Sequence, residues 1–195
     1  MYSVTRSFGL KGLNGFAVAV EADVSGGLPA FSIVGLPDSA VRESADRVRA
    51  AIKNLGFKFP DRRITINLAP ADVRKTGPVY DLPLLLALLI SSGQLEAVPS
   101  DAAFLGELAL DGTLRPVSGV LPMALAAAES GIRALYVPAE NAAEAAEACA
   151  DGMAQLWSME IDGLERRAFV SSAVGEWLTA VCADRGCVRK EGETD

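Results

Sequence analysis

The residues best suited to chemistry lie between residues 70 and 81, where a polar loop runs into a long apolar segment. Lys75 and Thr76 stand directly before Gly77 and Pro78, and a tight Gly-Pro turn at the start of a helix is a typical place for a functional group. The pair comes close to a phosphate-binding loop, but the glycines that this motif requires before the lysine are missing. We therefore expect no nucleotide site of this kind in the chain.

The composition restricts nucleophilic catalysis. The chain contains no histidine, which excludes Ser-His-Asp and Cys-His arrangements and leaves a Ser-Lys pair or an N-terminal threonine. A lysine that acts as a base must be desolvated, whereas the lysines of this chain stand in charged or turn segments. The lack of histidine also argues against a metal site.

The segment after the loop is expected to form a buried helix. Asp81 is expected to cap the first N–H groups of this helix, and Pro83 fits its first turn. Residues 84–90 are apolar throughout, and a helix without a polar face is buried on all sides. Residues 63–68 alternate as a strand does and lead directly into the loop, so strand, loop and buried helix are contiguous.

The remaining pattern predicts an α/β (α+β) fold in which helices pack on a mixed sheet. The expected elements are a hairpin over residues 2–9 and 15–24 with a turn at 13–15, a strand at 30–34, a helix capped by Asp38 and ended by Gly56, a hairpin around Asp111-Gly112, a helix at 122–130, a strand at 134–137 and a helix at 140–150. We expect one domain over residues 1–152. The divergent segment 153–195 is expected to hold a last helix between Trp157 and Leu178 and then a disordered tail.

Charge is unevenly distributed along the chain, whose net charge is −7. Residues 38–75 carry nine basic and five acidic residues, whereas residues 101–165 carry two basic and eleven acidic residues. The first stretch is suited to phosphate, although charge runs are more often solvated helix faces. We interpret the acidic residues of the Ala-rich segment 140–150 as such a face. Three cysteines and the lack of an apolar N-terminal segment predict a cytoplasmic protein without membrane contact.

Several motifs, in order along residues 2–150, carry a family resemblance. They are IVGLPD at 33–38, RVRAAI at 47–52, NLAPAD at 67–72, DLP at 81–83 and GEL at 106–108. With them the chain resembles the N-terminal domain of the ComM/YifB competence family, which is also called magnesium-chelatase-like or ChlI-type. The resemblance implies a Lon-protease-like fold of the ribosomal protein S5 domain 2 type. In this family the domain precedes an AAA+ ATPase module in a hexameric DNA helicase that acts in branch migration.

The resemblance also implies which residues occupy the two positions of the Ser-Lys catalytic dyad of Lon proteases. In Lon proteases a serine follows the Gly-Pro turn, and laid onto Gly77-Pro78 that position is Val79. The lysine of the dyad falls at Leu121 when the Lon pattern is laid onto Gly106-Glu107 and Gly119. Both positions hold aliphatic residues, so the chain is expected to be non-catalytic and to need no cofactor. ATP and Mg²⁺ are expected only in the AAA+ module.

The leading hypothesis is therefore a domain that makes contacts with like subunits and its own AAA+ module, engages DNA, or does both. The candidate DNA contacts are Arg42, Arg49, Lys53, Arg74 and Lys75. The arginines of the first helix are equally well explained as solvated partners of Glu43 and Asp46. Two alternatives stay open: a Ser-Lys peptidase with a relocated nucleophile, such as Ser118 or Ser91, and a pure oligomerisation domain.

Overall fold

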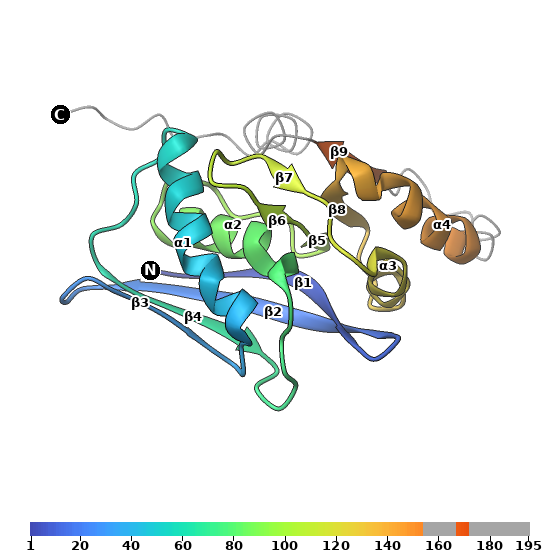
Figure 1. Cartoon of the computed structure of the whole chain (residues 1–195), viewed down its shortest axis with the longest axis horizontal. Coiled ribbons are helices and arrows are strands. Elements are labelled where there is room, and N and C mark those ends of the chain that lie inside the picture. The colour runs from blue at the N-terminus through green and yellow to red at the C-terminus, as the bar shows by residue number, and fades with distance from the viewer. Residues whose placement is uncertain (154–166, 172–195) are drawn as a thin grey trace.

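The computed structural model of the chain describes residues 1–153 and 167–171. Its first half is a four-stranded sheet of β1 (Tyr2–Lys11), β2 (Asn14–Ser25), β4 (Arg63–Ala69) and β3 (Ala30–Val34) in that spatial order (Figure 1). Neighbouring strands are antiparallel except β3 and β4, which are parallel. The predicted mixed sheet is thus confirmed.

The first hairpin differs from the prediction at its turn. Lys11 pairs with Asn14, so the turn consists of Gly12 and Leu13 and not of residues 13–15. Gly12 has a φ of 66°, a left-handed conformation that favours glycine in a two-residue hairpin loop. The turn predicted at residues 13–15 was therefore placed too far along the chain.

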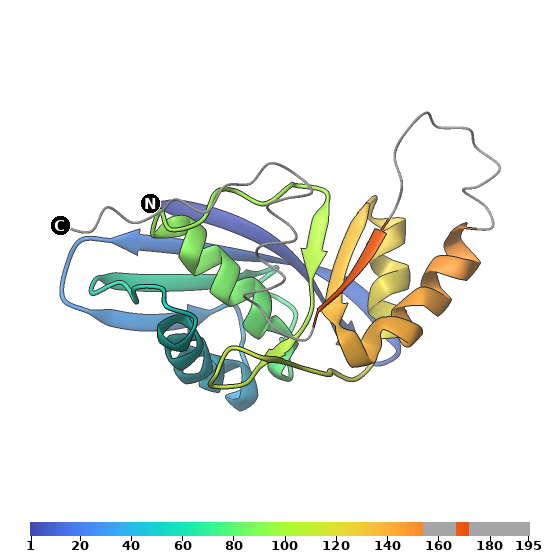
Figure 2. The same cartoon turned by 90° about the horizontal axis from the view of Figure 1, so that it is seen from above.

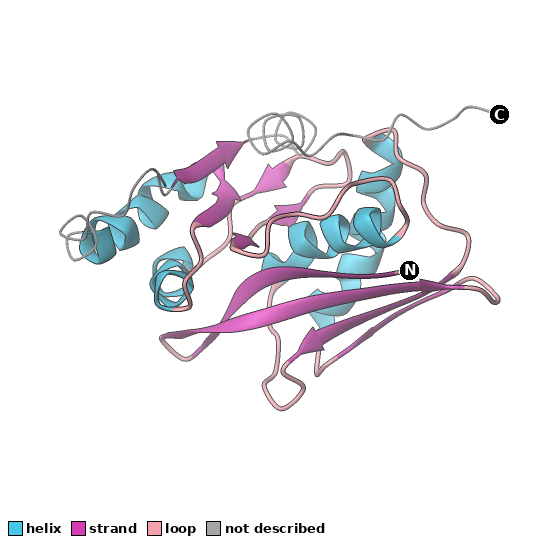
Figure 3. Cartoon of the chain, turned by 180° about the vertical axis from the view of Figure 1, so that it is seen from behind, coloured by secondary structure: helices cyan, strands magenta, loops and turns pink. Residues whose placement is uncertain are grey.

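Two helices cover one face of this sheet, as Figure 2 shows from above and Figure 3 from behind. They are α1 (Ser39–Asn54) and α2 (Asp81–Ser91), and a short 3-10 turn η1 (Pro78–Tyr80) leads into the second. Asp38 caps α1 as predicted, since its Oδ1 accepts from the Val41 N–H at 2.8 Å. Gly56, with a φ of 80°, follows the end of α1. In α2 every residue except Ile90 is buried, which confirms the helix predicted to have no polar face.

The second half adds two smaller sheets and two helices. β5 (Ala102–Phe104), β8 (Ala134–Pro138) and β9 (Arg167–Ser171) form a parallel sheet, and β6 (Glu107–Leu108) and β7 (Leu114–Arg115) form the short hairpin around Asp111-Gly112. The helices are α3 (Val120–Glu129) and α4 (Ala142–Met153), the latter preceded by the 3-10 turn η2 (Ala139–Asn141). None of the described helices has the length and apolar character needed to cross a bilayer.

The predicted last helix is wrong over residues 167–171. This segment contains Phe169 and pairs in parallel with β8 from Ala134 to Pro138. It is therefore a strand that extends the sheet of β5 and β8. The rest of the predicted helix and the predicted tail lie outside the described residues.

Candidate functional site

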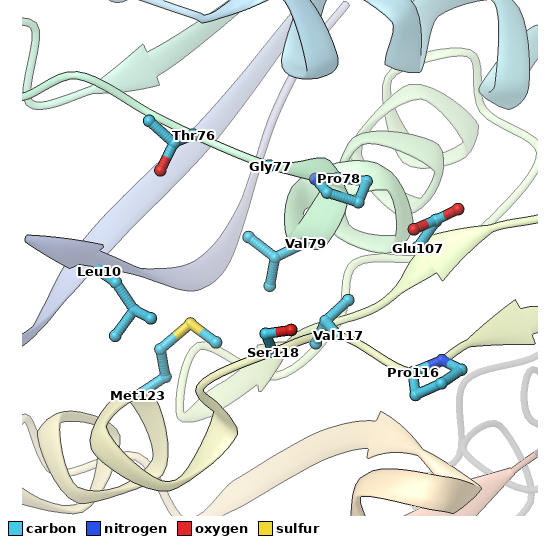
Figure 4. A pocket seen from close by; sticks show the side chains of 10 residues that line it. All are labelled: Leu10, Thr76, Gly77, Pro78, Val79, Glu107, Pro116, Val117, Ser118 and Met123. Atoms are coloured by element: carbon cyan, nitrogen blue, oxygen red, sulfur yellow. The ribbon is translucent and has the colours of Figure 1, made fainter. Parts of the chain in front are cut away.

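A pocket of about 490 Å³ lies where the entrance to α2 faces the segment before α3 (Figure 4). Its lining residues are Leu10, Thr76, Gly77, Pro78, Val79, Glu107, Pro116, Val117, Ser118 and Met123. This volume lies in the range of small-ligand sites. The lining brings together the Gly-Pro loop, which holds Val79, and residues 116–118, which precede Leu121 in sequence.

Val79 occupies the centre of this arrangement. Its side chain points toward the segment that holds Ser118, as Figure 4 shows, and only 6% of its surface is exposed. Leu121 lies in the first turn of α3 and is not among the residues that line the pocket. The residue that follows the Gly-Pro turn is thus a nearly buried aliphatic side chain.

The candidate relocated nucleophiles differ in access. Ser118 is exposed and lines the pocket, whereas Ser91 is buried in α2 and its hydroxyl donates to the Leu88 carbonyl at 3.2 Å. Within the described part of the chain, Glu107 is the one titratable side chain of the lining. Glu107 is 3.6 Å from the Arg115 guanidinium. Among the described residues that line the pocket, no lysine accompanies Ser118 to serve as a base.

Asp81 does not cap α2, contrary to the prediction. Tyr80 is the residue at the cap position, and no side chain caps the helix there. Asp81 is fully buried and its carboxylate accepts from the Arg47 Nε at 2.6 Å, the Arg47 Nη2 at 3.1 Å and the Leu108 N–H at 3.1 Å. Asp81 raises the pKa of Arg47, chiefly through this hydrogen bond. These contacts tie α1, α2 and β6 together at the start of α2.

Tyr80 fixes the other side of the same entrance. Its ring is fully buried, and its hydroxyl finds no hydrogen-bond partner among the residues that the structure describes. Burial, with a smaller contribution from Asp38, raises the pKa of this phenol. Gly9 leaves the space that the hydroxyl fills, since a Cβ at Gly9 would collide with it. Tyr80 is therefore a packing residue of the entrance.

The structure corrects the prediction for Lys75. Its side chain is buried, and its ammonium donates to the Pro70 carbonyl and, at 2.8 Å, to the Val73 carbonyl. Desolvation lowers the pKa of this ammonium, and the charge of Asp72 opposes that shift. Lys75 thus holds the loop of residues 70–75 from inside and is not exposed for a phosphate contact.

The other four predicted DNA contacts are exposed. Arg42, Arg49 and Lys53 follow one another at seven and four residues along α1, which places them on one face of the helix. Arg42 donates to the Pro37 carbonyl at 2.9 Å, and the Arg49 guanidinium lies 4.6 Å from the centre of the Phe59 ring. Arg74 lies in the loop before Lys75. In the described part of the chain none of these four side chains forms an ion pair within 4.0 Å.

Two residues that hold the segment around the start of α3 in place were not predicted from the sequence. Asn141 accepts from the Val117 N–H at 2.9 Å and donates to the Val117 carbonyl at 2.8 Å. Glu144, interpreted above as part of a solvated face, accepts from the Leu121 N–H at 3.0 Å and so caps the first turn of α3. Both partners are more than twenty residues away in sequence, and no local pattern signals such contacts.

The comparisons with known proteins agree with the resemblance. A family model described as subunit ChlI of Mg-chelatase matches residues 20–141. The chain is 49% identical to the uncharacterized protein YifB of Salmonella typhimurium over 134 residues, which is 68% of this chain and 26% of YifB. It is 46% identical to the competence protein ComM of Haemophilus influenzae over 144 residues, which is 73% of this chain and 28% of ComM.

A more distant relative confirms the Lon-protease-like fold. The Lon protease of Mycolicibacterium smegmatis is 31% identical over 144 residues, which is 71% of this chain and 18% of the protease. The chain thus spans about a quarter or less of the length of these relatives. Because the family model covers well over half of the 195 residues, the chain belongs to the family of subunit ChlI of Mg-chelatase.

Proposed function

We propose that this chain is a non-catalytic domain of a ComM-like AAA+ protein that processes DNA in natural transformation, including branch migration. In this proposal the domain serves the assembly of like subunits, the engagement of DNA, or both. ATP and Mg²⁺ act in the AAA+ module, which is its partner. The 46% identity to the competence protein ComM supports the proposed role in natural transformation.

The observation that carries the non-catalytic part is the packing of Val79. An aliphatic side chain stands at the Gly-Pro entrance to α2 and is 6% exposed, and the lining of the pocket offers no lysine in the described residues. Hydrolysis of casein or a fluorogenic peptide tests this directly. We expect no turnover by the wild-type chain. Turnover that disappears in the Ser118→Ala variant would establish the peptidase alternative instead.

The exposed basic face of α1 supports DNA engagement. Arg42, Arg49 and Lys53 share this face, and Arg74 lies in the loop that packs against the start of α1, where the Asp38 N–H donates to the Lys75 carbonyl at 3.0 Å. We expect labelled single-stranded and branched DNA to bind the chain with an affinity that falls as salt rises. Each phosphate contact contributes about 0.9 to the slope of log K against log salt on duplex DNA.

A variant of the basic face of α1 and a control variant at a distant arginine make this test specific. Arg42→Ala/Arg49→Ala/Lys53→Ala should reduce the salt slope, whereas Arg133→Ala should leave it unchanged. Arg133 is a suitable control because it is exposed, carries the same charge and already pairs with Asp101 at 2.7 Å. An absence of salt-sensitive binding at tens of micromolar protein would remove the direct DNA contact and leave the assembly role.

A further inference from the structure

No described strand pairs with the outer edge of β3 in the four-stranded sheet. β3 is the last strand in the sheet order and pairs with β4 on one side only, within the part of the chain that the structure describes. Residues 24–37, which include β3, contain no charged residue. Natural sheets protect such edges with lysines, bulges or covering elements, because a free edge is a template for another strand.

Apolar side chains flank this free edge. Leu28 is 86% exposed, Leu36 is 53% exposed and Val34 is 46% exposed. Leu36 has a φ of 57°, which is uncommon for a residue with a Cβ. Hydrogen bonds hold it in place, since its carbonyl accepts from the Lys75 N–H at 3.1 Å. The segment therefore presents its apolar side chains from a fixed backbone.

The hydrogen-bonding direction of β3 is defined by its partner. The Ala30 N–H donates toward the β4 side, to the Arg62 carbonyl at 3.4 Å. Because successive residues of a strand direct their N–H and C=O groups to opposite sides, Ser32 also faces β4, whereas Phe31 and Ile33 direct theirs to the free edge. The edge thus offers two donors and two acceptors spaced for another strand.

We propose that β3 pairs with β3 of a second copy of this chain, antiparallel and about a two-fold axis at Ser32. In this register Phe31 of each copy exchanges two hydrogen bonds with Ile33 of the other. The two Ser32 residues face each other as a non-hydrogen-bonded pair, whose Cα atoms are typically about 4.5 Å apart. The result is one continuous sheet across two copies.

The sequence of the edge is complementary to itself in this register. Ala30 stands opposite Val34 in this register, and the exposed Leu28 and Leu36 lie just outside the two ends of β3. A two-fold contact requires such self-complementarity. Two copies that each carry a net charge of −7 repel one another, and they approach here along a stretch that contributes no charge. This contact rests on the assembly role in the proposed function.

Cross-linking tests the register. In the full 195-residue chain with Cys149, Cys182 and Cys187 changed to serine, Ser32→Cys should form a disulfide-linked dimer upon mild oxidation, because a non-hydrogen-bonded pair has the short Cα separation that a disulfide needs. Ser100→Cys is the matched control, since Ser100 is also exposed. No excess of cross-linked dimer in Ser32→Cys over this control would overturn the proposal.

The mass in solution tests the contact itself. Light scattering of the unmodified chain at rising concentration should show a transition from one chain to twice that mass. Ser32→Lys should remain a single chain, because it sets two like charges directly opposite each other, whereas Ser100→Lys should dimerise like the wild type. A single chain at every concentration, or a Ser32→Lys variant that still dimerises, would refute the pairing. The same variants are titrated with DNA in parallel. A chain that never dimerises but still binds DNA would refute the pairing alone, whereas a chain that dimerises but binds no DNA would refute the proposed DNA role alone.

Discussion

The ion pair between Arg47 and the buried Asp81 leads to a quantitative prediction for Asp81→Asn. The carboxylate of Asp81 accepts three N–H groups, two from Arg47 and one from Leu108. An asparagine keeps the shape but offers a single acceptor oxygen. The guanidinium then loses its counter-charge, and at least one of the three donors loses its partner.

The expected cost is about 3 kcal/mol of unfolding free energy. Removing one partner of a buried ion pair costs about 3–5 kcal/mol. The lower end applies here because the Arg47 side chain is 19% exposed and keeps partial hydration. It also keeps hydrogen bonds to the Ala40 carbonyl at 3.0 Å and the Ser44 hydroxyl at 3.2 Å.

Urea unfolding followed by far-UV circular dichroism measures this cost. Asp46→Asn is the matched control, since Asp46 lies on the exposed face of α1 and should change the unfolding free energy by less than about 0.5 kcal/mol. Arg47→Met/Asp81→Leu should recover part of the loss, because it removes both charges together. A loss below about 1 kcal/mol in Asp81→Asn would refute the view that this pair holds the entrance to α2.

Two substitutions and one titration test other parts of the molecule. Lys75→Met should cost about 2 kcal/mol at neutral pH through two lost charged hydrogen bonds. It should also abolish the stability that the wild type gains as pH rises toward 10.5, because burial lowers the lysine pKa. Gly35→Ala should lower the melting temperature strongly, since its φ is 95° and its Cβ would collide with backbone, whereas Gly26→Ala, with open space, should not. Nuclear magnetic resonance should show Asp111 titrating below 3.8, because hydrogen bonds from Thr113 favour its carboxylate, and these bonds weaken as pH falls through that lowered pKa.

The sequence predicted those features that local chemistry decides. The α2 helix followed from an apolar run without a polar face, and the start of α1 followed from Asp38, a typical N-cap residue. Asp81 was misplaced because an aspartate before an apolar run is typical of a cap, whereas its true partner is Arg47, thirty-four residues away. An ion pair between distant elements leaves no periodic signal in either of them.

Burial of single polar residues was equally hard to predict. Lys75 follows Arg74 in a polar loop, and nothing in that pattern distinguishes the two. The structure separates them because the loop folds back and turns the Pro70 and Val73 carbonyls onto the Lys75 ammonium. The same reason explains why Glu144 looked like part of a solvated face, since its partner is the backbone of another helix.

The edge of the sheet and the basic face of α1 are linked through the geometry of the proposed dimer. Antiparallel pairing within one continuous sheet requires a two-fold axis perpendicular to it, so both copies carry their helices on the same face. Arg42, Arg49 and Lys53 of the two copies then lie on one side of the joined sheet. A single DNA molecule that reaches both sets would bind with the gain of a bivalent contact, so affinity should rise with protein concentration and Ser32→Lys should weaken it more than Ser100→Lys does. Equal DNA affinity of the two lysine variants would show that assembly and DNA engagement are separate properties of this domain.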